Sequence, residues 1–188
     1  YPSTFTISLV FLILSIIVRN QARNNYIVKL VSIILSSVVL ITHPTTAIFL
    51  FICIICLGIA YNNTSIRKSL LDSLTIILPC AFLCVLWPYF NFIDLLSGSN
   101  FDFHNDSKTL YYGIIKKNWP IIFITPSFYL IKKDKTVHFF VSSLILMSLI
   151  FTVGIITKIY GVSRVISYIM IIAHMLTAYT LIYLLKHY

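Results

Sequence analysis

The sequence predicts an all-helical membrane protein with about seven transmembrane helices and one interfacial helix. The 188 residues are 59% hydrophobic and only 10% charged, and their mean hydropathy is +0.96. Soluble domains carry about 25% charged residues. The apolar residues also gather in runs close to the length of about 17 to 25 residues that crosses a bilayer. A chain so poor in charge cannot cover a water-facing surface, so lipid must surround most of it.

Polar or charged segments separate these apolar runs along the chain. The seven expected spans are residues 4–18, 26–41, 45–60, 70–92, 119–131, 137–157 and 165–185. Residues 109–118 hold Lys116 and Lys117 within an apolar stretch, which predicts a helix lying in the membrane interface. Pro126 is expected to bend the short fifth span. Asp72 is expected in the first turn of the fourth span, where a carboxylate suits the helix dipole.

The charge is strongly basic, with 14 Lys and Arg against five acidic residues. These cations stand at the ends of the apolar runs and form no basic stripe, which argues against a nucleic-acid partner and for contact with membrane lipids. More of them fall on the connections after the first, third and fifth spans and at the C-terminus than on the other connections. The positive-inside rule then predicts a multi-pass membrane protein with a cytoplasmic C-terminus.

The domain organisation follows from the same topology. Residues 1–188 contain no repeat and no low-complexity linker, which predicts a single helical transmembrane domain. Seven spans ending in the cytoplasm place Tyr1 on the outer side. An outer N-terminus without a signal peptide is natural if further spans precede it, so we expect the chain to be the C-terminal part of a larger membrane protein.

The turn "THPTT" places His43 between two apolar runs on the predicted outer side. Pro44 fits the first turn of a helix, where its missing N–H costs nothing, and Thr42 or His43 would then be the cap. Alternatively, a neutral imidazole at the outer surface could donate a hydrogen bond to a phosphate or a sugar hydroxyl. Both interpretations remain open from the sequence.

The loop "FDFHNDSK" carries an alternating polar cluster of Asp102, His104 and Asp106. In an extended segment these side chains would point the same way and could bind a divalent cation or supply a general base. The alternative is a solvated loop with ordinary turn chemistry. No other cofactor is indicated by the sequence.

Three further sets of residues could form sites or serve only packing. Arg164 begins the last span, where a cation is unfavourable for the helix dipole, which suggests a role in holding a phosphate or an anionic headgroup. His174 lies in the middle of the same span and is expected to be a hydrogen-bonded packing residue near Tyr168 and Tyr179. The four cysteines lie inside apolar runs without accompanying His or carboxylate groups, which favours packing over a metal site: Cys53, Cys56, Cys80 and Cys84.

Three segments in order, "THPTTAIFLFICIICLGIA", "FLCVLWPYFNFIDLL" and "YGVSRVISYIMIIAHMLTAYTLIYLL", resemble the C-terminal half of bacterial GT-C-type membrane glycosyltransferases. The resemblance implies transfer of a hexosyl or pentosyl group from a polyprenyl-phosphate donor at the outer face of the cell envelope. It also implies that His43, Arg164 and Lys158 lie near the donor phosphate. The family's catalytic aspartate lies in a first outer loop that has no counterpart here, so no catalytic residue is assigned.

Two other classes of function fit the same features. A non-catalytic membrane subunit or scaffold would need only packing faces and membrane-protein partners. A transporter or flippase of lipid-linked intermediates would also use basic residues on the outer side.

Overall fold

A computed structural model describes residues 2–20, 25–61, 66–87, 134–157 and 165–187. Within these ranges every regular element is an α-helix, as the sequence predicts. The helices are α1 (Pro2–Asn20), α2 (Tyr26–Thr42), α3 (Pro44–Tyr61), α4 (Ile66–Val85), α8 (Lys135–Thr157) and α9 (Val165–His187). The predicted interfacial helix at 109–118, the short fifth span at 119–131 and the bend at Pro126 lie outside the described residues.

Four of the described helices are long and apolar enough to cross a membrane, namely α3, α4, α8 and α9. The helices α1 and α2 are also apolar but have shorter apolar stretches, Thr4–Arg19 and Tyr26–Thr42. At about 1.5 Å per residue such a stretch measures about 25 Å, slightly less than a hydrocarbon core of about 30 Å. The protein is therefore a multi-pass helical membrane protein, and the prediction of seven spans is not confirmed.

The helix bounds follow the apolar runs closely except in the fourth. The predicted fourth span is residues 70–92, whereas α4 ends at Val85, and residues 88–92 lie outside the described residues. At its start, α4 begins earlier, at Ile66, and includes Arg67 and Lys68 in its first turn. A prediction from apolar runs does not include this first turn, because the turn carries charged side chains although its backbone is helical. As a result Asp72 lies in the second turn rather than the first, so its predicted interaction with the helix N-terminus is wrong.

The chain divides into two compact units, Tyr1–Ser99 and Asn100–Tyr188, called unit 1 and unit 2 here. The prediction of a single domain over residues 1–188 stays a prediction. In unit 1, α3 contacts all three other described helices and is the most buried of them. Its core side chains include Phe49, Leu50 and Ile52. Because these residues lie on several sides of α3, the helix forms the centre of the unit.

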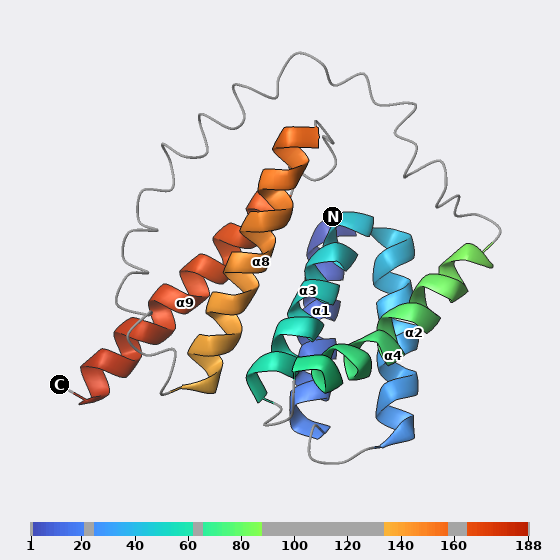
Figure 1. The fold of residues 1–188 in the computed structure, drawn as a ribbon. Coiled ribbons are helices and arrows are strands. Elements are labelled where there is room, and N and C mark those ends of the chain that lie inside the picture. Colours follow the sequence, from blue (N-terminus) through green and yellow to red (C-terminus); the bar gives the residue numbers. More distant parts are fainter. Residues whose placement is uncertain (1, 21–24, 62–65, 88–133, 158–164, 188) are drawn as a thin grey trace. The chain divides into compact units, whose positions relative to one another are not determined.

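The helix α4 is inclined to the other three helices of unit 1 (Figure 1). Its first half approaches the end of α3, where Ser73 Oγ lies within 3.5 Å of the Ile54 carbonyl oxygen. Its second half reaches α2, where the Cys84 thiol donates to the Ser37 carbonyl at 3.8 Å. Small residues at these contacts allow the backbones to come close, which is the usual way that helices pack in a membrane.

The helices α3 and α4 approach each other closely at Gly58. A Cβ atom built on Gly58 would lie 3.3 Å from Ser73 Oγ and 3.4 Å from the Ser69 carbonyl oxygen. A methyl group at position 58 would therefore be tightly packed, and a larger side chain would have no space at this helix separation.

Unit 2 contains α8 and α9, which pack side by side as an antiparallel pair (Figure 1). The buried side chains on α8 include Val137, Val141 and Met147, and those on α9 include Ile172 and Leu176. Their spacing of about one and two helical turns gives each helix one apolar face against the other. Outward-facing side chains such as Leu149 and Leu185 are suited to lipid.

Candidate functional site

His43 is the single residue between α2 and α3. Its backbone groups close α2 and open α3. Its backbone N–H donates to the Val39 carbonyl at 2.9 Å, which closes α2. Its own carbonyl accepts from the N–H groups of Thr46 at 2.9 Å and Ala47 at 3.1 Å, which opens α3. Pro44 occupies the first helical position, as the sequence predicts.

The imidazole ring of His43 is half-buried and held on one side by threonines. Its Nδ1 lies 2.8 Å from Thr46 Oγ1 and 2.9 Å from Thr45 Oγ1. It also accepts from the backbone N–H of Thr46 at 3.3 Å. A backbone N–H can only donate, so Nδ1 is an acceptor and the proton of the neutral ring is on Nε2.

The predicted cap is therefore His43 rather than Thr42. The side chain of His43 accepts a second, longer hydrogen bond from the Thr46 N–H, which also donates to the His43 carbonyl at the start of α3. The Thr42 hydroxyl donates back to the Val38 carbonyl at 2.7 Å and so belongs to the end of α2. A further hydroxyl supports the arrangement from α1, since Thr6 Oγ1 donates to Thr46 Oγ1 at 3.4 Å and both threonines are fully buried.

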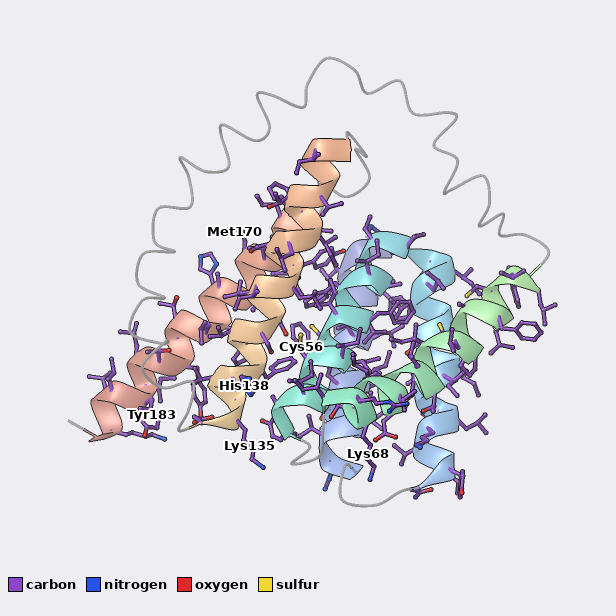
Figure 2. The ribbon with its side chains drawn as sticks, viewed as in Figure 1. Cys56, Lys68, Lys135, His138, Met170 and Tyr183 are labelled. Carbon is purple, nitrogen blue, oxygen red and sulfur yellow. The ribbon has the colours of Figure 1, made fainter. Side chains whose placement is uncertain are left out.

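The charges of unit 1 are concentrated at the end away from His43. Because the helices alternate in direction, Arg19 at the end of α1 and Lys29 at the start of α2 lie at one end of the unit with Arg67 and Lys68 at the start of α4. Figure 2 shows Lys68 at that end. In the described part of unit 1 no Lys or Arg lies at the His43 end. Among the described residues, the imidazole thus lies at an end of unit 1 that carries no Lys or Arg.

The other predicted site residues lie outside the described residues. These are Lys158 and Arg164 before the last helix and the polar cluster of Asp102, His104 and Asp106. Whether they lie near His43 stays a prediction.

His174 and the cysteines can be placed. His174 Nδ1 donates to the Met170 carbonyl at 2.6 Å, so the predicted hydrogen bond is present. Its side chain is exposed, however, so the predicted packing role is wrong. All four cysteines are buried in unit 1 as free thiols. Among the residues that the structure describes, no group of three His, Cys or Asp side chains could hold a metal ion.

Sequence reasoning missed a polar contact in unit 2 between Asp134 and Tyr179. Asp134 caps α8, because its Oδ1 accepts from the N–H groups of Thr136 at 2.7 Å and Val137 at 3.4 Å. Its Oδ2 accepts from the Tyr179 hydroxyl of α9 at 2.6 Å. Figure 2 shows Lys135 and His138 of α8 at the same end of unit 2 as Tyr183, one turn after Tyr179. An aspartate before an apolar run is a known cap signal, but the partner on α9 could not be read from the sequence.

The hydrogen bonds to Asp134 change its acidity. Burial raises the pKa of this carboxyl group, but hydrogen bonds from Tyr179 and from the N–H groups of Thr136 and Val137 outweigh that effect. The pKa of Asp134 therefore lies below its ordinary value. The charged carboxylate is favoured in the folded protein because it accepts all of these bonds.

This lowered pKa predicts a pH dependence for the stability of unit 2. The carboxylate stabilises the folded unit above the unfolded pKa of about 3.9, and the contribution is lost as the pH falls through the lower folded value. We expect wild-type thermal stability in detergent to fall below about pH 4. Asp134→Asn, which keeps a capping side chain, should show a smaller fall over the same range. Equal slopes for the two proteins would contradict the assignment.

The fold and these contacts define the class of the protein as a multi-pass helical membrane protein. Comparison of the chain with protein-family models, with curated proteins and with solved structures found no match.

Proposed function

We propose that the chain is part of the membrane domain of a GT-C-type glycosyltransferase-like protein that uses a polyprenyl-phosphate-linked sugar at the outer face of a bacterial inner membrane. The observation that carries the proposal is the His43 ring, whose Nδ1 is engaged by threonines so that Nε2 is the donor. A neutral N–H donor held in one orientation at a helix junction can bind a phosphate oxygen without the cost of ordering a flexible side chain.

The charge distribution of unit 1 supports the proposed orientation. The cations Arg19, Lys29, Arg67 and Lys68 lie at the end opposite His43, and such ends face the cytoplasm by the positive-inside rule. The His43 end of unit 1 would then face outward. The cytoplasmic C-terminus remains part of the proposal and rests on the distribution of Lys and Arg along the sequence. The resemblance also assigns Arg164 and Lys158 to the donor phosphate, and the proposal keeps that assignment for the positive charge that the phosphate needs.

A non-catalytic membrane subunit is a second candidate, and the same ring favours it. The Nδ1 atom of His43 already has a structural role as the cap of α3, so the residue needs no ligand to explain its presence. The two candidates differ in what they require of Nε2. Only the enzyme needs the Nε2–H donor, whereas both need the cap.

Substitution of His43 by asparagine separates these requirements. Asparagine is among the best capping residues and should preserve the start of α3, whereas alanine should cost about 1 kcal/mol of stability. Under the enzyme proposal, His43→Asn should fold like the wild type yet slow sugar transfer about 10-fold or more, because one charge-assisted hydrogen bond is worth about 1.5–3 kcal/mol. The measurement is mass spectrometry of polyprenyl-phosphate sugars extracted from cells that carry each variant in place of the native gene.

The controls distinguish the remaining functions. Arg164→Ala should also make the lipid-linked donor accumulate while leaving the protein in the membrane at its normal level. Accumulation confined to the cytoplasmic leaflet would indicate a flippase instead. Normal turnover in both His43→Asn and Arg164→Ala would contradict the enzyme proposal and leave the subunit.

A further inference from the structure

In the part of unit 1 that the structure describes, four cations lie at the end opposite His43, which we call the basic end: Arg19, Lys29, Arg67 and Lys68. The side chains of Arg19, Arg67 and Lys68 are exposed, and that of Lys29 is half-buried. The one acidic residue in the described part of unit 1 is Asp72, which is exposed one turn further along α4. The basic end therefore presents a strong local excess of positive charge.

Apolar side chains lie directly beside these cations. Tyr26 and Ile27 in the first turn of α2 are 81% and 70% exposed, and Ile66 at the start of α4 is 64% exposed. Exposed groups of this kind next to water would be unfavourable. Beside a membrane surface they are favoured, because tyrosine rings and aliphatic chains settle where headgroups meet acyl chains.

The position of the cations in the helices also calls for an anion. Lys29, Arg67 and Lys68 lie in the first turns of α2 and α4, and neither first turn contains an acidic side chain. The positive end of the helix dipole disfavours cations at this position. An anionic group between the cations and the helix starts would relieve that repulsion.

We propose that the basic end binds phospholipids with anionic headgroups, whose phosphate contacts the cations while the acyl chains cover the neighbouring apolar side chains. The combination of cations and apolar side chains favours a phospholipid over a free phosphate, because a free phosphate would contact only the cations. This inference does not depend on the proposed glycosyltransferase function, because it concerns the opposite end of the unit.

The test uses the purified full-length protein in neutral detergent with equal amounts of phosphatidylglycerol and phosphatidylcholine of the same acyl chains. Native mass spectrometry counts the lipids of each kind that stay bound. We expect the wild type to retain phosphatidylglycerol in preference. The Arg67→Gln/Lys68→Gln variant should lose that preference by about fivefold for each cation removed. The charge-conserving Arg67→Lys/Lys68→Arg variant should keep it.

A charge-matched control shows whether the location matters. Lys135→Gln/Lys186→Gln removes two cations from unit 2 and should lower the preference less than the substitutions at the basic end. Equal losses would mean that net charge alone decides, and the proposal would be wrong.

Two measurements on the wild type do not depend on any variant folding. The preference for phosphatidylglycerol should collapse in about 1 M salt, where the screening length falls to about 3 Å. An excess of inorganic phosphate should leave the lipid bound. Displacement of the lipid by inorganic phosphate would indicate a site for a free anion, and equal retention of the two lipids would remove the basis for any site.

Discussion

Replacement of Gly58 by leucine should lower the free energy of unfolding of unit 1 by about 2–3 kcal/mol. The reason is the close approach of α3 and α4, where even a Cβ at position 58 would lie 3.3 Å from Ser73 Oγ and 3.4 Å from the Ser69 carbonyl oxygen. A longer side chain has no space there unless α4 moves away from α3. Thermal unfolding of the full-length protein in detergent would measure the loss.

The Gly58→Ala variant is the matched control. Alanine gains about 1 kcal/mol of helix propensity over glycine, which offsets much of the tight contact with the Ser73 hydroxyl. We therefore expect Gly58→Ala to stay within about 1 kcal/mol of the wild type. If Ser73→Ala raises the stability of Gly58→Ala but not that of the wild type, Ser73 Oγ is the atom that crowds the alanine methyl group. Wild-type stability for Gly58→Leu would show that the helices do not pack closely at this position.

Replacement of Asp134 by alanine should destabilise unit 2 by about 2.5 kcal/mol. The substitution removes the cap of α8, which is worth about 1 kcal/mol. It also removes the acceptor of the Tyr179 hydroxyl at 2.6 Å, and a hydrogen bond to a charged group is worth about 1.5–3 kcal/mol. The half-buried position of Asp134 puts the expected total near the lower end of the sum.

Two milder variants divide the effect of Asp134→Ala into its parts. Asp134→Asn keeps a capping oxygen and loses the charge, and Tyr179→Phe keeps the cap and loses the hydroxyl. Thermal unfolding of the two single variants and of the double variant gives the coupling between the residues. A coupling near zero would mean that Asp134 acts as a cap alone.

The sequence predicts helices well where an apolar run ends at charged or polar residues. The starts of α2 and α9 and the end of α8 coincide with the predicted limits, because polar residues flank the apolar runs there. The start of α4 was missed because its first turn is polar, and hydropathy cannot distinguish a polar helical turn from a polar connection. A run of apolar residues also does not determine whether a helix crosses the membrane. The helices α1 and α2 are apolar, but their apolar stretches are shorter than those of the four candidate spans.

Local signals predicted part of the candidate site, and contacts between helices did not. Pro44 after His43 indicated a helix start, and the cap role of His43 follows from that local pattern. The Thr6–Thr46 bond joins residues 40 positions apart, and the Asp134–Tyr179 bond joins residues 45 positions apart. Such pairs depend on how helices pack, which no single segment encodes. The exposure of His174 has the same origin, since helical position alone does not say which face another helix covers.

All four cysteines of the chain lie in α3 and α4, and each is buried. A thiol reagent added to the folded protein would therefore reach them only when α3 or α4 moves away from its neighbouring helices or unfolds. The native chain thus contains its own probe of unit 1, with no introduced label and no thiol in unit 2 to contribute background. Modification rates counted by mass would follow the opening of unit 1, while loss of helical circular dichroism would follow every helix of the protein.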